Sequence, residues 1–445
     1  MRKIHIKLVW FALVFIHPFC VNAGEMQPFE PILQSFEPIT KEQYPALIFV
    51  QRDSMAPRSE QKSLMVATFD GKTPYVQKII AAESINTTQL GDAVFLVSAV
   101  QFSRDPAPWS QSYFLINFNT GSSVLLLKRE MSRRVSCSNL EPLMCLRSVP
   151  DQNEAVLFQN LPSTDESTLI HVDLNTLETV ELYTLPRNIE IEGFHDPCLP
   201  CILRISPDFK KLATMQYGEW LEMQQVYSLR MLDLETMQAV ELDDQVVIEI
   251  SPVSSMLPIP SFEWISAQEI IYQHMIPEDV NEGGLFRTHA EYVLKNVNIE
   301  TGEITELVRN RLPLTLDGGY IDYNWFTGDW SIYADPNNVI STPVDNQLPY
   351  SIKEEPYSVE IYYQDQLICR HKGDYWRTGS CLSHSQEHFA YYIIYDRYQI
   401  STALYAMTKD MEKPVQVAQI SDGSSLIAWI EDTTNLRREQ PVIDY

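Results

Sequence analysis

The chain has 445 residues, with 33 lysines and arginines against 59 aspartates and glutamates, which gives a formal net charge of −26. This excess of negative charge argues against nucleic acid and anionic membrane surfaces as partners, because both repel an acidic protein. Hydrophobic residues make up 45% of the sequence and aromatic residues 11%, a composition that excludes intrinsic disorder.

Residues 1–23 have the pattern of a cleaved secretory signal peptide. A basic start, MRKIHIK, precedes a short apolar run, and Val21 and Ala23 stand at the −3 and −1 positions of a cleavage signal. No later apolar run approaches the roughly 18 residues of a membrane span. We therefore expect an exported protein, periplasmic or secreted, with no membrane insertion and one domain over residues 24–445. An uncleaved anchor is the alternative.

One hairpin pattern recurs about every 60 residues along the chain. Each copy has an alternating apolar and polar strand, a bend that starts with Asn or Asp, and a second alternating strand. At such a bend, Asn, Asp and Thr side chains can hydrogen-bond their own backbone, and glycine can supply a positive φ. The four clearest copies have aligned threonines at Thr120, Thr176, Thr236 and Thr301.

Further copies extend the repeat over nearly the whole chain. Three weaker hairpins occupy 63–79, 358–370 and 403–419. A second pattern, a strand, a turn and a strand, precedes several hairpins; its copies are 146–159, 203–217, 263–273 and 382–394. Repeated four-stranded antiparallel units predict an all-β fold, a single β-propeller with seven four-stranded blades. Six or eight blades remain open, because the first and last copies are weak.

The two ends of the chain offer a way to close the ring. The first unit has three strands, 46–51, 63–69 and 75–79, and the C-terminal region has one spare strand, SLIAWIE at 425–431. We predict that this spare strand becomes the innermost strand of the first blade and joins the N-terminal and C-terminal regions.

The segment ISPDFKKLATMQY at 205–217 resembles the Ser-Pro-Asp-Gly-Lys repeat of TolB-like propellers, a repeat that is also found in the propellers of the prolyl oligopeptidase family. The Asp-x-x-Thr-Gly hairpin is similar to those of the same broad TolB-like and WD-repeat-like group. Phe209 stands where the repeat has glycine. The resemblance implies a propeller and no particular activity. No Gly-x-Ser-x-Gly motif is present, so the likeness supplies no serine nucleophile.

The predicted blades carry their longest connections on one face. In an antiparallel blade, the turns between the first and second and between the third and fourth strands emerge on one face, and the other connections emerge on the opposite face. Long loops on a rigid scaffold commonly carry binding sites. These loops are 101–111, 217–226, 274–290 and 335–357. The candidate binding residues on this face, which we expect to be exposed, are Trp109, Trp220, Phe286, Arg287, His289, Tyr350 and Arg397.

The cysteines predict disulfide bonds in the connections on the same face. The chain has seven cysteines, and six remain after the leader, an even number for an oxidising compartment. We expect three local disulfides, and these are Cys137–Cys145, Cys198–Cys201 and Cys369–Cys381. A redox or zinc site at CLPC is the alternative, but a strand-like segment follows it and no second close Cys or His pair accompanies it.

The sequence predicts no metal and no cofactor. The run HSQEH at 384–388 matches the His-x-x-Glu-His pattern of inverted zinc proteases. That chemistry needs both histidines on one face of a helix, whereas a strongly β-forming segment follows this run. We therefore interpret the match as a coincidence.

We expect a noncatalytic propeller, monomeric, that serves as a scaffold for a protein partner or a glycan. A propeller-fold glycoside hydrolase or lyase, with carboxylates at the axial funnel, is the first alternative. A glycan-binding module with exposed aromatic rings is the second. Charged side chains that converge at the axis favour an enzyme, whereas a broad face with aromatic spots favours an interaction platform.

Overall fold

The computed structural model describes most of the chain between residues 31 and 431. The described residues are 31–53, 56–57, 60–70, 73–101, 109–131, 143–149, 152–160, 166–186, 203–221, 224–248, 262–277, 290–310, 321–324, 329–332, 350–355, 357–373, 377–383, 385, 387–394, 402–408, 411–421 and 424–431. They form thirty strands and one short 3-10 helix, η1 (Lys41–Gln43). Within these ranges, no helix is long and apolar enough to cross a membrane.

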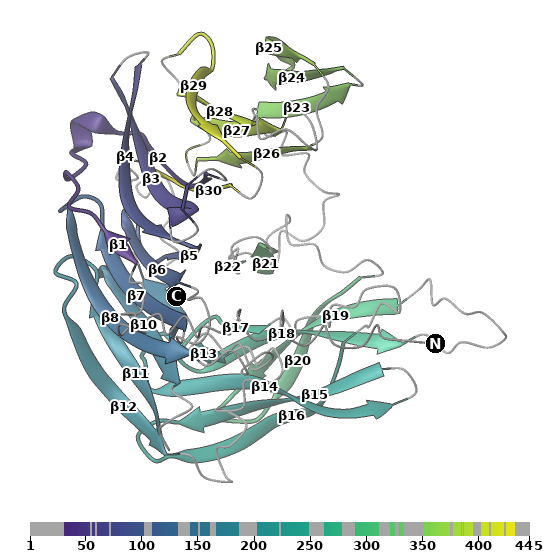
Figure 1. Ribbon diagram of the computed structural model, residues 1–445. Coiled ribbons are helices and arrows are strands. Elements are labelled where there is room, and N and C mark those ends of the chain that lie inside the picture. The colour runs from purple at the N-terminus through teal and green to yellow at the C-terminus, as the bar shows by residue number, and fades with distance from the viewer. Residues whose placement is uncertain are drawn as a thin grey trace, which may run out of the picture.

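The fold is an all-β propeller, and its antiparallel sheets follow one another along the chain (Figure 1). Four consecutive blades have four strands each. The second blade has β5 (Ser84–Gln89), β6 (Val94–Gln101), β7 (Trp109–Asn117) and β8 (Ser122–Met131), and the third has β9 (Leu143–Val149), β10 (Glu154–Asn160), β11 (Glu166–Asp173) and β12 (Thr179–Pro186). The fourth has β13 (Leu203–Ile205), β14 (Lys211–Leu221), β15 (Gln224–Asp233) and β16 (Gln238–Ile248), and the fifth has β17 (Phe262–Trp264), β18 (Glu269–Pro277), β19 (Ala290–Asn298) and β20 (Ile304–Asn310).

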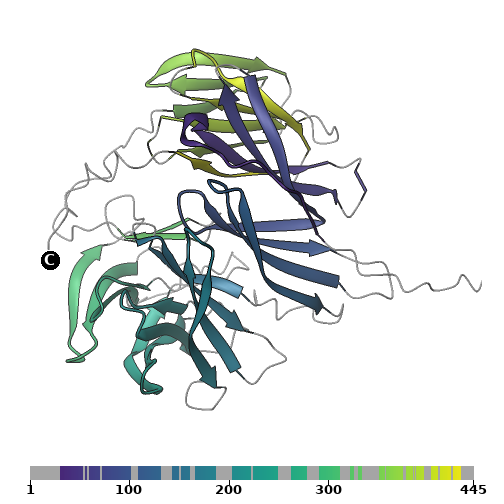
Figure 2. The ribbon, with the colours of Figure 1, turned by 90° about the vertical axis from the view of Figure 1, so that its left-hand side faces the viewer.

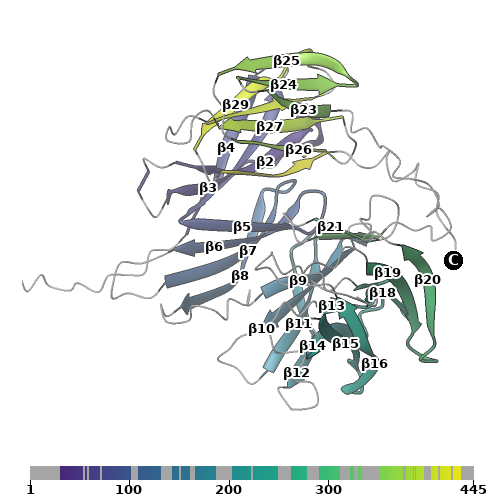
Figure 3. The same cartoon turned by 90° about the vertical axis from the view of Figure 1, so that its right-hand side faces the viewer.

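The last third of the chain completes the series. The final blade has β26 (Arg377–Leu382), β27 (Phe389–Ile394), β28 (Thr402–Met407) and β29 (Val415–Ile420). Where the repeat predicts a sixth blade, the described residues form a two-stranded and a three-stranded sheet. These strands are β21 (Ile321–Asn324) with β22 (Asp329–Ile332), and β23 (Tyr350–Glu355) with β24 (Ser358–Tyr363) and β25 (Gln366–Lys372). Figure 3 shows the three-stranded sheet beside the final blade.

The predicted closure of the ring is confirmed. β30 (Ser425–Ile430) pairs with β2 (Ala46–Arg52), the next strands in this first blade are β3 (Lys62–Asp70) and β4 (Thr73–Ala82), and Ile48 lies opposite Ala428. β30 also contacts β26, the innermost strand of the final blade (Figure 1). The Trp429 indole donates a hydrogen bond to the Cys381 carbonyl at 3.2 Å. A short strand that the sequence analysis did not predict, β1 (Ile32–Leu33), covers the outer edge of β4.

The predicted hairpin bends share one hydrogen-bonding scheme. In each, a carboxylate or amide oxygen accepts backbone N–H groups two and three residues ahead, at distances between 2.8 and 3.2 Å. The accepting residues are Asn117, Asp173, Asp233 and Asn298. A residue with positive φ follows each aligned threonine, and these residues are Gly121 (67°), Leu177 (60°), Met237 (56°) and Gly302 (71°). The bends therefore depend on the Asn or Asp side chain more than on glycine.

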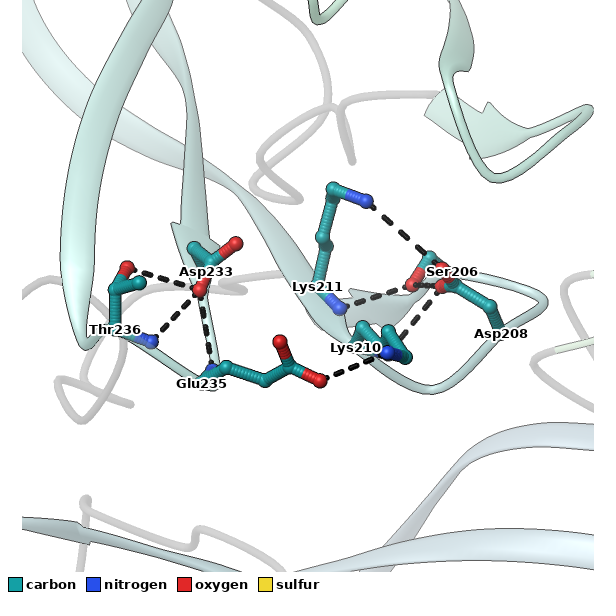
Figure 4. Close-up of polar contacts among 7 residues, drawn as sticks. All are labelled: Ser206, Asp208, Lys210, Lys211, Asp233, Glu235 and Thr236. Carbon is teal, nitrogen blue, oxygen red and sulfur yellow. Dashed lines mark hydrogen bonds and ion pairs between the residues drawn. The ribbon is translucent and has the colours of Figure 1, made fainter.

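Figure 4 shows how the two tight turns of the fourth blade meet. The Ser206 hydroxyl donates to Asp208 at 2.5 Å and accepts the Lys211 backbone N–H at 2.9 Å. Phe209 has a φ of 60°, which explains why related repeats place glycine there. The Lys210 ammonium group reaches Glu235 in the neighbouring turn at 2.8 Å, so both turns lie on the same face (Figure 4).

The strand bounds confirm the expected division between short and long connections. Figure 4 shows two turns of the fourth blade, and the corresponding turns of the second blade, between β5 and β6 and between β7 and β8, are also short. The opposite connections include 102–108, 132–142, 187–202, 249–261 and 278–289, whose own residues lie outside the description. Two predicted loops are wrong. Within 217–226, β14 extends to Leu221 and β15 begins at Gln224, and within 335–357, residues Tyr350–Glu355 form β23. The prediction for 217–226 failed because the alternation of polar and apolar residues stops before the end of β14 and resumes only after the start of β15.

The hydrophobic core lies between neighbouring blades, which fan out in Figure 2. Between the fourth and fifth blades, Met215 and Leu229 pack with Phe262, Trp264 and Tyr272, and all five are at most 4% exposed. Each blade buries its faces only against the next blade, so a single blade is not a stable unit.

Candidate functional site

Most of the predicted binding residues lie outside the described residues. These are Phe286, Arg287, His289 and Arg397. Trp220 lies in β14, where only the backbone is described. Trp109 is half-buried at the start of β7, next to the long connection 102–108. Trp109 therefore remains a predicted binding residue at the edge of the long-loop face.

The expectation that Tyr350 is exposed is wrong. Tyr350 is only 5% exposed, and its ring stacks on Phe389 with ring centroids 4.9 Å apart. Its hydroxyl donates to the Glu387 carbonyl at 3.3 Å, and burial raises its pKa to about 12. Tyr350 begins β23, a strand that packs on the final blade, so the side chain belongs to the core between these sheets.

The expected disulfide between Cys369 and Cys381 is also wrong. The two thiols do not bond to each other. Cys369 lies on β25 at the edge of its sheet and packs with residues of the final blade, whereas Cys381 lies on β26 in another core cluster. Because one strand ends a sheet and the other begins the next at the axis, proximity in sequence does not bring the sulfurs together. Cys145 lies on β9 as predicted; the other members of the expected pairs, Cys137, Cys198 and Cys201, lie outside the described residues.

The His-x-x-Glu-His match lies in a turn. Among its described residues, His388 directly precedes β27 and is buried, and none of them is helical. The His388 imidazole lies 3.8 Å from Glu431, and the Ser385 hydroxyl donates to the same carboxylate at 2.6 Å. These contacts attach the final blade to the residue that follows β30. Across the described ranges, no group of three or more His, Cys, Asp or Glu side chains could hold a metal ion.

Three charged residues occupy one equivalent position on the innermost strands of three consecutive blades. Arg147 lies on β9, Arg204 on β13 and Glu263 on β17. Their ladder partners on the second strands are Val156, Ala213 and Ile271. On each second strand, the ladder partner lies two residues after the residue opposite the Asn or Asp that begins the hairpin bend. Those opposite pairs are Glu154 with Asp173, Lys211 with Asp233 and Glu269 with Asn298. We call Arg147, Arg204 and Glu263 the axial cluster.

The three side chains of the axial cluster converge. The Arg204 Nε donates to Glu263 Oε2 at 3.1 Å, and Arg147 Nη1 lies 3.7 Å from Glu263 Oε1. β9 and β17 belong to blades separated by the whole fourth blade, so a contact between them passes along the inner, axial edge. The side chains of Arg147, Arg204 and Glu263 are 25%, 14% and 12% exposed.

Burial and the neighbouring positive charges have opposite effects on the pKa of Glu263. Burial raises its pKa, and the Arg204 charge, the Trp264 backbone N–H and the Arg147 charge oppose this rise. Trp264 donates its N–H to Glu263 Oε1 at 3.0 Å and its indole N–H to the Arg204 carbonyl at 3.1 Å. These bonds fix the carboxylate beside two guanidinium groups. The axial cluster thus brings two guanidinium groups to one carboxylate.

The sequence analysis missed the axial cluster, although a signal was available. Leu-Arg-Ser-Val-Pro-Asp at 146–151 and Leu-Arg-Ile-Ser-Pro-Asp at 203–208 align directly, and Phe-Glu-Trp at 262–264 takes the place of Leu-Arg-Ile. A column that holds Arg, Arg and Glu on a buried inner strand is unusual, because unpaired charges are rarely buried. Aligning the repeats by strand register would have identified this column.

A second buried polar cluster lies between the outer strand of the fourth blade and the fifth blade. The Tyr272 hydroxyl donates to Asp243 at 2.5 Å, and the Lys295 ammonium lies 3.4 Å from the same carboxylate. Burial alone would raise the pKa of Asp243, but hydrogen bonds from Tyr272 and the Gln245 N–H, with Lys295, lower it overall. Burial, with the Lys295 charge, lowers the pKa of the nearby His274 to about 4. This cluster is neutral in total and connects two blades.

Comparison with protein-family models gave no match, and comparison with curated proteins gave none. Among solved structures, the chain is similar to the β-propeller domain of the Trilobed protease from Pyrococcus furiosus, with 12% identity and a TM-score of 0.35 over 76% of this chain and 98% of that one. It is also similar to an acylaminoacyl peptidase from Pyrococcus horikoshii, with 11% identity, a TM-score of 0.34, and 76% and 53% of the two chains covered. An oligogalacturonate lyase from Vibrio parahaemolyticus matches at 14% identity and a TM-score of 0.28, over 88% and 97%. Likenesses this distant carry no argument about activity.

Proposed function

We propose that this chain is an exported, noncatalytic propeller of the TolB-like or WD-repeat-like kind, which binds a protein partner or a glycan through its long-loop face. The division of the connections supports this proposal. On the short-turn face, the Asn and Asp side chains already accept the backbone N–H groups of their own turns. Variable length is confined to the opposite face, and loops held by a rigid scaffold are suited to recognition.

The axial cluster bears on the enzymatic alternative. Convergence of charged side chains at the axis is what a propeller enzyme needs, but a glycoside hydrolase of the usual kind needs two carboxyl groups across the scissile bond. The axial cluster has one, Glu263, and it is engaged by Arg204 and Arg147. The strands β13 and β17 have three residues each, so Arg204 and Glu263 lie as close to the long connections as to the short turns. The presence of a single carboxyl group in the cluster supports binding over hydrolysis.

The Cys369 thiol is also unsuited to act as a catalytic nucleophile. The Cys369 sulfur lies 3.4 Å from the His371 Nε2. Burial raises the pKa of this thiol, and burial lowers the pKa of the imidazole. Both shifts favour the neutral pair over the thiolate and imidazolium pair that a cysteine nucleophile requires.

The proposal is tested by isolating a partner on the immobilised full chain and measuring its affinity for two matched variants. Trp109→Leu removes an aromatic ring at the edge of the long-loop face, and Tyr75→Leu removes an exposed ring beside the short turn of the first blade. We expect Trp109→Leu to weaken the Kd about tenfold, as for an aromatic hot spot, and Tyr75→Leu to leave it unchanged. Equal effects, or a loss with Tyr75→Leu alone, would contradict binding through the long-loop face.

The enzymatic alternative has its own test. The full chain is incubated with a panel of neutral and acidic oligosaccharides, and new reducing ends or unsaturated products are measured for wild type and Glu263→Gln. Product formation by wild type that is lost in Glu263→Gln would replace the binding proposal with the axial enzyme.

A further inference from the structure

We propose that residues 32–44 form a strap, which connects the first blade to the second and covers a strand edge that would otherwise pair with a second copy of this chain. The strap begins with β1 at the outer edge of the first blade and ends just before β2. On its way it contacts the bend between β7 and β8, on the short-turn face. The proposal therefore does not depend on the partner of the long-loop face.

The strand edge that the strap covers is unusually apolar. Residues 79–82, the end of β4, are two isoleucines and two alanines, and all four are 0% exposed. β1 pairs with this part of β4, and the Gln34 N–H donates to the Ile79 carbonyl at 2.8 Å. In the second blade, the corresponding residues 128–130 of the outer strand are Lys, Arg and Glu. Charged side chains protect an edge strand from pairing with another molecule, and at the end of β4 the strap takes their place.

The strap is also attached to the second blade. The Ile39 N–H donates to the Phe118 carbonyl at 2.8 Å, and the Tyr44 hydroxyl donates to the Asn119 side-chain oxygen at 2.5 Å. The Phe36 ring lies against the Phe118 ring, with centroids 5.7 Å apart. The Ile39 side chain is 2% exposed and belongs to the core that the first two blades share. The strap thus connects two blades as well as covering an edge.

Gly121 is the position of the second blade that accommodates the strap. A Cβ atom here would lie 3.1 Å from the Pro38 ring and 3.2 Å from the Phe36 carbonyl oxygen. The equivalent residues of the next two blades are Leu177 and Met237, and they adopt nearly the same positive φ. The bend itself therefore tolerates a large side chain. We infer that glycine is required at residue 121 by the contact with the strap rather than by the turn.

The first test compares Gly121→Leu with Gly302→Leu in the full chain, by amide hydrogen exchange and mass spectrometry. Both variants place leucine at the same turn position with positive φ, but no described residue beyond its chain neighbours lies within 4 Å of a Cβ atom at residue 302. We expect exchange in peptides that cover 34–39 to become about tenfold faster or more in Gly121→Leu, because the clash releases the strap. Gly302→Leu should leave it unchanged. Equal exchange of 34–39 in the two variants would overturn the proposal.

The second test is sedimentation velocity over a range of protein concentrations. Gly121→Leu should form dimers or larger species at concentrations where wild type and Gly302→Leu do not, because release of β1 leaves the apolar edge of β4 unpaired. Phe36→Ala weakens the same contact from the side of the strap, without altering the bend, and should show both effects to a smaller extent. Its control is Tyr75→Ala, which removes an exposed ring from β4 and should show neither.

Peptides from β11 are the internal reference for exchange, because this strand lies in the third blade, away from the strap. Exchange that rises equally in 34–39 and in β11 would assign Gly121 to the stability of the whole ring and overturn the proposal. Unchanged exchange in Phe36→Ala, or a released strap without self-association, would overturn it as well.

Discussion

Glu263 and Asp243 are both carboxylates with little exposed surface beside basic side chains, yet their pKa values shift in opposite directions. Asp243 faces one ammonium group and a tyrosine hydroxyl, and its pKa is lowered. Glu263 faces two guanidinium groups, and burial still raises its pKa. The first cluster connects the fourth and fifth blades. The second connects the innermost strands of three blades at the axis.

The two clusters also differ in their surroundings. The groups around Asp243 lie between two packed sheets and depend on one another for solvation. In the axial cluster, the Arg147 side chain is 25% exposed, so water solvates part of its charge.

The largest expected effect is the loss of Asp243. Asp243→Ala leaves Lys295 without its carboxylate and Tyr272 without its acceptor, and removing one partner of a buried pair costs about 3 kcal/mol or more. Urea unfolding at neutral pH measures this loss. The matched control is Asp243→Asn, which keeps an acceptor for Tyr272 and should lose less. A loss below about 1 kcal/mol in Asp243→Ala would remove the structural role assigned to this cluster.

Glu263→Gln should have a smaller effect on stability. The amide still accepts from Arg204 and from the Trp264 N–H, and the variant no longer buries a charged carboxylate. We expect a loss of about 1 kcal/mol in the free energy of unfolding, by the same measurement. A loss as large as that of Asp243→Ala would mean that the two clusters serve the same structural purpose.

The two carboxylates should also respond to pH with opposite sign. Because the folded-state pKa of Glu263 is raised, the folded state takes up a proton at higher pH than the unfolded chain. The stability of wild type relative to Glu263→Gln should therefore increase as pH falls through the folded pKa towards the ordinary value of 4.5.

Asp243 contributes stability that is fully present above its ordinary pKa of 3.8 and is lost as pH falls through its lower folded pKa. The stability of wild type relative to Asp243→Ala should stay constant from about pH 7 to about pH 5. Urea unfolding of the three proteins at several pH values checks both signs. If the stability of wild type relative to each variant changed with pH in the same way, the opposite pKa shifts of Glu263 and Asp243 would be contradicted.

The smallest expected effect is at the turns, where geometry matters more than charge. Asp233→Ala removes the acceptor for the N–H groups of Glu235 and Thr236 and should cost about 1 kcal/mol. Asp233→Asn should have nearly no effect, because Asn117 and Asn298 make the same bend elsewhere. Thermal unfolding of both variants measures the difference; a large loss in Asp233→Asn would show that the charge is required.

Much of the fold could be predicted from the sequence because its determinants are local. The Asn or Asp and Thr of each hairpin are close in the chain, and their hydrogen bonds lie within the turn. Even ring closure was predictable, because a spare strand at 425–430 had no other partner. Local patterns of this kind repeat in every blade and support one another.

The features that the sequence did not predict depend on contacts between blades. The burial of Tyr350 follows from packing on Phe389, and the separation of Cys369 from Cys381 follows from their positions at the edges of different sheets. The axial cluster needs the register of three blades at once, because one residue of slip moves a side chain to the other face of its strand. The hairpin pattern predicts each blade, but it does not determine how neighbouring blades pack or how their strands are aligned with one another.

The pairing of β2 with β30 also sets the order in which the molecule can be completed during synthesis. β2 leaves the ribosome before the strands of the other blades, and Ala46–Val50 are at most 2% exposed in the finished protein. Residues 425–430, which cover one edge of that strand, are synthesised only after the described strands of those blades. Until then, the nascent chain has an unpaired, apolar strand edge, a surface that favours aggregation. A chaperone that acts on this chain would be needed at β2 until β30 has been made.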